Sequence, residues 1–123
     1  MAKYLMDTDV IIWYLRGKED TVSLIKNLSK EGELAISAIS RTEILMGTLE
    51  KERTATEEFL NALSTYNVDV YTADMAGDFI KEYRAKGITL EIPDALIAAT
   101  AIANNLTLVT YNKKHYPMVK SIL

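Results

Sequence analysis

The sequence predicts an α/β fold, a three-layer α/β/α sandwich with a central parallel sheet of four to five short strands. Short apolar runs alternate with longer stretches that carry an apolar stripe at helical spacing. Turn signals separate these units, and neither a low-complexity linker nor an internal repeat interrupts them. Alternating strands and helices favour parallel pairing, because parallel neighbours need crossover connections that helices supply.

Each element is expected from its own residues. Strands are expected at residues 3–7, 34–37, 68–72 and 106–110, with 121–123 as a candidate short edge strand. Helices are expected at residues 9–16, 21–31, 38–50, 55–65, 73–86 and 92–105. Gly17, Gly32 and Gly87 follow three of these helices, where glycine commonly ends a helix. Asp20 is expected to cap the second helix, and Pro93 suits the first turn of the last one.

Length and composition indicate one globular domain spanning residues 1–123. With 49% hydrophobic and 25% charged residues, the chain has an ordinary globular composition. A chain of this size buries about two-thirds of its unfolded surface around one core. It has no secretion signal and no apolar run of about 18 residues, so we expect a cytoplasmic protein without membrane contact.

The same composition excludes several kinds of site. Without cysteine there is neither a disulfide framework nor a thiolate metal site, and the lone His115 excludes a site made of several histidines. The net charge of −3 argues against a general basic surface for nucleic acid. Any contact with nucleic acid must therefore be local.

Oxygen-bearing side chains stand where strands end and helices begin. Asp7 closes the first strand, and Glu43 lies near the start of the helix that follows the second strand. Asp94 stands in the first turn of an Ala-rich helix, and Thr110 and Asn112 follow the last confident strand. Sites in open α/β sheets form outside the carboxyl ends of the strands, so we expect these side chains on one rim.

Most of these residues also have a purely structural interpretation. Asp94 after a proline can simply stabilise a helix start. Ser40 and Glu43 fit the capping box S-x-x-E about as well as they fit a catalytic role. Asn112 can be an ordinary turn residue.

Asp7 fits a structural role least well. It ends an apolar strand, and Thr8 or Asp9 can already cap the following helix; we interpret Asp9 mainly as that N-cap. Two carboxylates about 4 Å apart repel by about 4 kcal/mol at an effective dielectric near 20, so a three-acid cluster needs a cation. Oxygen ligands without thiolate suit Mg²⁺ or Mn²⁺ rather than zinc, and Mg²⁺ bridges to phosphate oxygens.

Three stretches together resemble a known family. They are YLMDTDVIIWYLRG at 4–17, SAISRTEILMG at 37–47 and IPDALIAATAIANNLTLVTYNKKHY at 92–116. In this order and spacing they resemble PIN domains, specifically the VapC-type toxin ribonucleases of toxin–antitoxin pairs. The resemblance extends over nearly the whole chain, from about residue 3 to residue 116.

This resemblance implies a metal-dependent endoribonuclease that leaves a 3′-hydroxyl and a 5′-phosphate. Asp7 and Asp94 would hold Mg²⁺ or Mn²⁺ directly, while Glu43 would hold the ion or orient a water. The family often has a fourth acid after the last strand, where this chain has Asn112, and sometimes an acid where it has His115. One-metal and two-metal chemistry therefore both remain open.

Further residues near the acids are assigned substrate-binding or auxiliary roles. Thr110 and Asn112 would position water or phosphate, and Lys113 and Lys114 are the nearest candidates for contacts with the RNA backbone. For Lys114 a solvated surface turn is the favoured interpretation. The auxiliary set as a whole is Thr8, Asp9, Thr110, Lys113 and His115.

The family also implies partners. The substrate would be an RNA of the tRNA or rRNA class, a VapB-like antitoxin would block the acidic pocket, and a homodimer is typical. Trp13, Tyr14 and Leu15 are candidates for the antitoxin groove, since helix-in-groove binding needs aromatic and aliphatic anchors. Core packing explains Trp13 equally well.

Two other functions compete with this one. DTDVI at 7–11 resembles the opening motif of haloacid-dehalogenase-like phosphomonoesterases, and GDFIKE at 77–82 mimics their acidic motif. Against this, Ile11 replaces Thr or Val and Asp78 falls within a helical pattern. The neutral Asn112 motivates the other alternative, a catalytically inactive PIN-like module that binds a protein partner.

Overall fold

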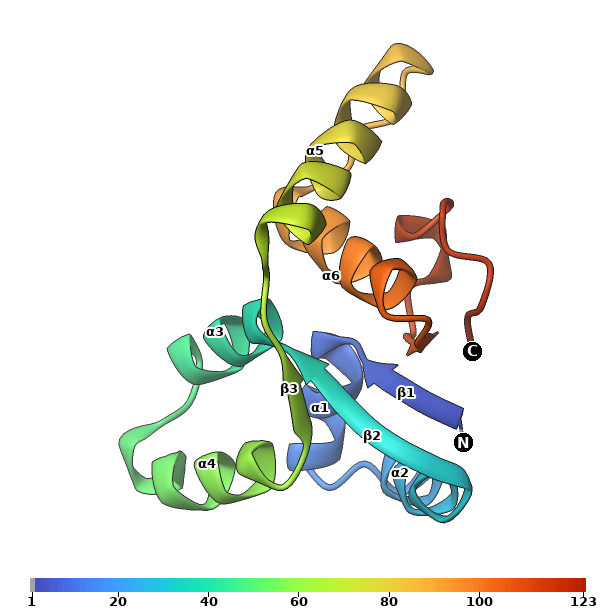
Figure 1. Ribbon diagram of the computed structural model, residues 1–123. Coiled ribbons are helices and arrows are strands. Elements are labelled where there is room, and N and C mark those ends of the chain that lie inside the picture. Colours follow the sequence, from blue (N-terminus) through green and yellow to red (C-terminus); the bar gives the residue numbers. More distant parts are fainter. Residues whose placement is uncertain (1) are drawn as a thin grey trace.

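The computed structural model describes residues 2–123 and has a four-stranded sheet at its centre (Figure 1). The strands are β1 (Ala2–Met6), β2 (Gly32–Ser37), β3 (Ser64–Tyr66) and β4 (Thr107–Val109). All pairings are parallel, in the order β3-β2-β1-β4. The candidate edge strand at 121–123 is reduced to a single parallel bridge between Leu108 and Ile122.

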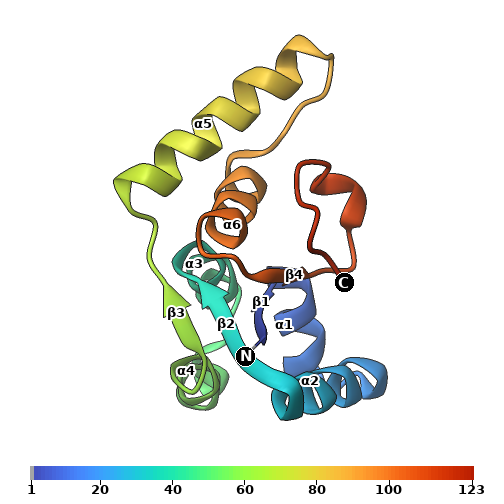
Figure 2. The ribbon, with the colours of Figure 1, turned by 45° about the vertical axis from the view of Figure 1, so that its right-hand side comes forward.

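Helices cover both faces of this sheet. They are α1 (Thr8–Leu15), α2 (Glu19–Glu31), α3 (Ala38–Met46), α4 (Arg53–Asn61), α5 (Val70–Ala85) and α6 (Ile92–Ala103), with short 3₁₀ turns η1 (Glu50–Glu52) and η2 (Lys113–His115). Figures 1 and 2 show α5 and α6 on one side and α1, α2 and α4 on the other. The expected three-layer α/β fold is therefore confirmed. No helix formed by residues 2–123 combines the length and apolar character needed to cross a bilayer.

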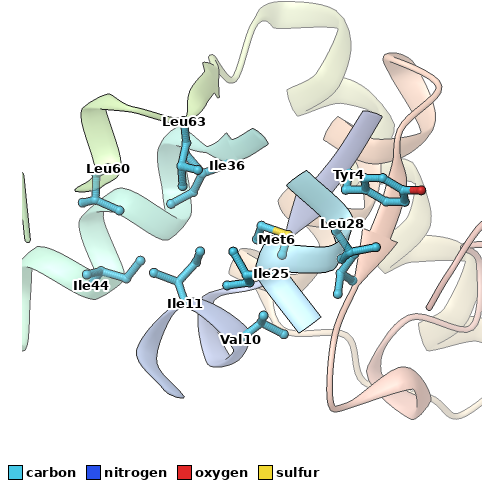
Figure 3. Close-up of a cluster of buried hydrophobic side chains, with 11 residues drawn as sticks. Tyr4, Met6, Val10, Ile11, Ile25, Leu28, Ile36, Ile44, Leu60 and Leu63 are labelled. Atoms are coloured by element: carbon cyan, nitrogen blue, oxygen red, sulfur yellow. The ribbon is translucent and has the colours of Figure 1, made fainter. Parts of the chain in front are cut away.

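The side-chain alternation of β1 divides the core between the two faces. Tyr4 and Met6 pack with buried side chains of α1, α2, α3 and α4, including Ile11 and Leu60 (Figure 3). Leu5 points to the opposite face and packs in the cluster that includes buried residues of α6. Successive strand residues point to opposite faces, so the three buried residues at the end of β1 serve both layers of the core.

The strand predicted at 68–72 is wrong, because this segment begins α5. Asp69 is the N-cap, and its carboxylate accepts a hydrogen bond of 2.8 Å from the Thr72 N–H. Two apolar residues of this segment, Val70 and Tyr71, are 78% and 65% exposed, which a half-buried strand would not allow for both. The third strand lies earlier, at Ser64–Tyr66, because α4 ends at Asn61, short of the predicted helix end. A capping aspartate here prevails over the period-two pattern.

Two predicted caps at the start of helices are also wrong. The N-cap of α1 is Asp7 and not Asp9, and its Oδ1 accepts a hydrogen bond of 2.8 Å from the Thr8 N–H. Asp20 lies in the first turn of α2, whose N-cap is Lys18. In contrast, Gly17 lies just beyond α1 with φ of +76°, a left-handed conformation that glycine adopts easily.

The capping box proposed for Ser40 and Glu43 is wrong for the same kind of reason. The N-cap of α3 is Ser37, whose Oγ accepts a hydrogen bond of 3.2 Å from the Ile39 N–H. Ser40 and Glu43 therefore lie inside the helix, one turn apart. Their side chains are free to contact another element, and Ser40 is fully buried.

The cap at Asp69 gives a prediction about stability. Asp69→Ala should lower the Tm at about pH 7, since the first turn of α5 loses an acceptor. The hydrogen bond from the Thr72 N–H holds the pKa of Asp69 in the folded protein below its ordinary value. The stabilisation that Asp69 contributes is therefore complete above its pKa in the unfolded chain, and it is lost as pH falls through the lower pKa of the folded protein. Thermal unfolding from about pH 7 to about pH 3 should show the difference shrinking. Asp69→Asn keeps an acceptor and is the control; an equal loss there would contradict the cap.

Candidate active site

The candidate site lies at the carboxyl edge of the sheet and is organised around Asp7. Asp7 follows β1 directly, is 6% exposed, and donates its backbone N–H to the Val109 carbonyl of β4 at 2.9 Å. Its Oδ1 accepts a hydrogen bond from the Thr8 N–H. Its Oδ2 accepts hydrogen bonds from Thr110 Oγ1 at 2.7 Å and from the Tyr116 hydroxyl at 2.9 Å. The first turn of α1 and two residues of the C-terminal segment thus converge on one carboxylate.

The Tyr116 hydroxyl joins Asp7 to Asp94. It lies 2.9 Å from Asp7 Oδ2 and 3.3 Å from Asp94 Oδ1, and the Tyr116 side chain is fully buried. Burial, followed by the charges of both carboxylates, raises the pKa of Tyr116. The hydroxyl therefore stays protonated and acts as a hydrogen-bond donor to the carboxylates. Burial and the charge of Asp7 raise the pKa of Asp94, against the opposing effect of His115. Asp7 and Asp94 thus meet on one hydroxyl, and their role as cation ligands stays a prediction.

Glu43 reaches the same edge through Thr8. The Thr8 hydroxyl donates to Glu43 Oε1 at 2.7 Å and also lies 2.9 Å from Ser40 Oγ. Since the Thr8 N–H is bonded to Asp7, one residue connects the acid of α3 to the acid after β1. After burial and the charge of Asp7, the charge of Glu43 also raises the pKa of Asp94, so Asp94 interacts electrostatically with both other acids.

Asp9 forms a second small cluster beside the first. Its Oδ2 accepts hydrogen bonds from Asn112 Nδ2 at 2.8 Å and from the Tyr111 N–H at 3.2 Å. Its Oδ1 is buried without a hydrogen-bond partner among residues 2–123. Burial and the charge of Asp7 raise the pKa of Asp9 to about 6. Asn112 therefore contacts Asp9 and is not hydrogen-bonded to Asp7 or Asp94.

The basic residues near the site are peripheral. His115 Nδ1 lies 3.5 Å from Asp94 Oδ2, and both side chains are partly exposed. Lys113 and Lys114 are exposed in η2 and form no ion pair within the described chain. The structure brings His115 to the acids and leaves both lysines at the rim.

The donor chemistry fits a hard divalent cation. Asp7, Glu43 and Asp94 offer carboxylate oxygens, and in the described part of the chain neither lysine nor arginine pairs with any of them. However, no group of three or more His, Cys, Asp or Glu side chains among residues 2–123 is gathered closely enough to hold an ion. The expected tight three-acid cup is thus not formed, because hydroxyls of Tyr116 and Thr8 lie between carboxylates that repel one another.

Tyr116 is a site residue that the sequence analysis did not nominate. It follows the last strand by several residues, in a segment with only a short 3₁₀ turn. Its position at the end of the third family-like stretch was the available signal, since a buried tyrosine usually directs its hydroxyl to a partner.

The three residues proposed for an antitoxin groove do not share one groove. Tyr14 stacks on Phe59, with ring centroids 4.5 Å apart, and lines a groove of about 520 Å³. Leu15 lines a different groove of about 660 Å³, which also contains Glu43. Trp13 is 40% exposed and contacts cations instead.

Comparison with known proteins identifies the family. Residues 4–119 match the PIN domain, so the chain belongs to the PIN-domain family, which has a nuclease fold. Ribonucleases of this family generally depend on divalent metals. The resemblance inferred from the sequence is confirmed. The phosphomonoesterase alternative is wrong, and Asp78 of its supposed acidic motif is an exposed residue inside α5.

Within the family the chain is similar to VapC proteins. Ribonuclease VapC10 of Mycobacterium tuberculosis is 36% identical over 121 residues, which cover 96% of this chain and 89% of VapC10. The DNA-bound VapBC structure from Salmonella typhimurium matches with a TM-score of 0.83 at 27% identity, over 99% of this chain and 96% of that one. VapBC2 from Rickettsia felis, bound to a promoter DNA fragment, matches with a TM-score of 0.80 at 29% identity, over 91% and 89%.

The Tyr116 bridge gives a prediction about metal-free protein. Tyr116→Phe should lower the free energy of unfolding by about 1–3 kcal/mol, because the buried carboxylate of Asp7 and the half-buried carboxylate of Asp94 lose their shared donor. Urea denaturation in EDTA measures the loss. Tyr83→Phe, in α5 and away from the acids, is the control and should change stability by less than about 0.5 kcal/mol. If Tyr116→Phe has no larger effect than the control, the bridge does not stabilise the site.

Proposed function

We propose that the protein is an Mg²⁺- or Mn²⁺-dependent endoribonuclease, the toxin component of a type II toxin–antitoxin pair. The observation that carries this proposal is the meeting of Asp7 and Asp94 on one hydroxyl at the carboxyl edge, with Glu43 joined through Thr8. Membership of the PIN-domain family and similarity to VapC ribonucleases support it.

In this proposal Asp7 and Asp94 hold the cation, and Glu43 holds it or orients the attacking water. When bound, a divalent cation lowers the pKa of water and offsets the negative charge that develops at phosphorus. Thr110 fixes Asp7 through Oδ2, and Thr8 fixes Glu43 through Oε1, so both carboxylates are oriented before substrate arrives. The products are a 3′-hydroxyl and a 5′-phosphate.

We further propose chemistry with one cation rather than two. The residue at the usual place of a fourth acid is Asn112, and its amide Nδ2 is engaged with Asp9. Asn112 therefore holds Asp9 in place through a donated hydrogen bond, and contributes no negative charge for a second ion. Its role is positioning, which differs from the role of an acid at the same place.

The partner proposed for this toxin is a VapB-like antitoxin that occupies the groove of about 660 Å³. Ile12 and Leu15 give this groove apolar anchors, and Glu43 gives it one acidic site residue. An amphipathic antitoxin helix that lies there can direct a basic side chain toward the acids. The VapBC complexes among the solved relatives support this partner. We also propose a homodimer, a cytoplasmic location and an RNA target of the tRNA or rRNA class.

The nuclease proposal predicts loss of cleavage in acid variants. Asp7→Asn and Asp94→Asn should each lower Mn²⁺-dependent cleavage of RNA by on the order of 100-fold or more, because a cation ligand loses its charge. Asp78→Asn removes an exposed acid of α5 and is the matched control. Mapping the cleaved ends should give 3′-hydroxyl and 5′-phosphate termini. Undiminished cleavage by Asp94→Asn would contradict the assignment, and release of phosphate from a phosphomonoester with intact RNA would overturn the reaction class.

Cation binding is predicted to stabilise the fold. Mn²⁺ at a hundredfold excess over its Kd should add about 2.7 kcal/mol to the free energy of unfolding. Glu43→Gln keeps an acceptor for the Thr8 hydroxyl and removes one negative charge. We expect it to leave the Tm in EDTA nearly unchanged and to reduce the Mn²⁺-induced shift. An unchanged Tm of the unsubstituted protein up to high Mn²⁺ would count against an assembled cation site.

A further inference from the structure

Beside the acids lies a surface strip of two aromatic rings and two cations, formed by Trp13, Arg16, Lys18 and Tyr111. Lys18 Nζ lies 5.0 Å from the centroid of the Trp13 ring and 5.2 Å from that of Tyr111. Arg16 Cζ lies 5.4 Å from the Trp13 centroid. The two rings are 40% and 44% exposed, so both offer surface to a ligand. We call these four residues the aromatic–cation strip.

The sequence builds this strip by ending α1 abruptly. Gly17 takes a left-handed φ of +76°, and the chain turns back so that the Lys18 N–H donates to the Trp13 carbonyl at 3.1 Å. This turn returns the cationic side chains on either side of Gly17 to the indole that precedes them.

Tyr111 is fixed at both ends. Its hydroxyl lies 2.6 Å from Oγ1 of Thr21, a fully buried residue of α2, and its N–H donates to Asp9 Oδ2 at 3.2 Å. The preceding residue, Thr110, donates to Asp7 Oδ2. The ring is thus attached to the acid site by one peptide unit and two hydrogen bonds, which is more than a freely moving surface tyrosine shows.

We infer that the aromatic–cation strip binds an unpaired stretch of the substrate RNA next to the phosphate that is cut. This inference rests on the proposed nuclease function and names how that site holds its substrate. Aromatic faces stack bases of single-stranded nucleic acid, and neighbouring cations contact its phosphates. Tyr111 carries the strip to the acids, so a base stacked there lies close to the cleavage centre.

Charge supports RNA as the ligand. The chain has a net charge of −3, and its acidic edge repels phosphates until a cation is bound. Arg16 and Lys18 are exposed and form no ion pair within residues 2–123, so their charges are available. Both cations lie over ring faces, an interaction that a base and a phosphate can replace.

An acidic segment of the antitoxin is the competing ligand, since the same cations attract carboxylates. RNA is favoured because the strip is joined to the acid residues themselves. The groove that contains Leu15 and Glu43 is lined differently and shares only Arg16 with the strip. Binding of antitoxin alone is therefore an outcome that the experiment must be able to show.

The experiment uses Trp13, the only tryptophan of the chain, as its own probe. A single-stranded, uridine-rich RNA of about ten nucleotides is titrated in EDTA, so that binding is read without cleavage. We expect saturable quenching of tryptophan fluorescence. Tyr111→Leu should weaken binding about fivefold or more, because one stacking ring is lost. Lys18→Gln should make the negative slope of log K against log salt shallower by about 0.7, because one phosphate contact is lost.

The chain provides a matched control at the far end of α5. There Lys86 Nζ lies 4.9 Å from the Tyr83 ring centroid, a pair of the same chemistry. Figures 1 and 2 show that this end of α5 extends away from the sheet and from α1. Lys86→Gln removes the same charge and a similar cation–π contact. It should leave RNA affinity and its salt dependence unchanged. If Lys86→Gln lowers RNA affinity as much as Lys18→Gln does, the effect of Lys18 comes from the overall charge of the protein, and the inference is overturned.

Cleavage by the same variants separates this inference from the nuclease proposal. With Mn²⁺ and the same RNA, Lys18→Gln and Tyr111→Leu should raise KM far more than they lower kcat, and circular dichroism should show an unchanged fold. If the variants cleave RNA with an unchanged KM, the inference that the strip binds RNA is overturned, while the proposed nuclease function stands. Quenching without any cleavage would support the strip and overturn the nuclease. Weakened antitoxin binding with unchanged RNA affinity would assign the strip to the antitoxin.

Discussion

The arrangement of the site depends on the buried carboxylate of Asp7. Its oxygens accept hydrogen bonds from the first turn of α1, from the residue after β4 and from Tyr116 near the C-terminus. A buried carboxylate without hydrogen-bond donors costs several kcal/mol. Moving any of these donors away would therefore be unfavourable, and the hydrogen bonds hold them in place. The same bonds that satisfy Asp7 also set the position of Asp94, because they share the Tyr116 hydroxyl.

Much of this could be predicted from the sequence, because the signals were local and strong. Asp7 interrupts an apolar run, the strand–helix alternation requires parallel pairing, and the carboxyl-edge rule then places Asp7, Glu43 and Asp94 on one rim. The family resemblance added the order and spacing of the motifs. In the structure the three acids are connected through hydroxyl groups of Thr8 and Tyr116, while their function as one site stays a prediction.

The errors have a common cause, which is competition between local patterns. At 68–72 an alternating pattern and a capping aspartate predicted different elements, and the capping aspartate prevailed. At α1 and α3 several polar residues were able to cap, and the choice of Asp7 and Ser37 depends on where the strands end. The role of Tyr116 and the pairing of Asn112 with Asp9 depend on contacts across more than 100 residues, which no local pattern encodes.

The choice of neutral donors around the acids has a physical consequence. Thr8, Thr110 and Tyr116 orient carboxylates without adding positive charge, whereas a lysine or arginine in their place would cancel the charge and compete with a cation. Burial, followed by the charges of Asp7 and Glu43, raises the pKa of Asp94, so repulsion among the acids contributes to that shift. In the proposed nuclease a divalent cation would relieve this repulsion, so affinity for the cation and stabilisation by it would have one origin. Arg16 and Lys18 lie over aromatic ring faces, and within residues 2–123 neither forms an ion pair with these acids.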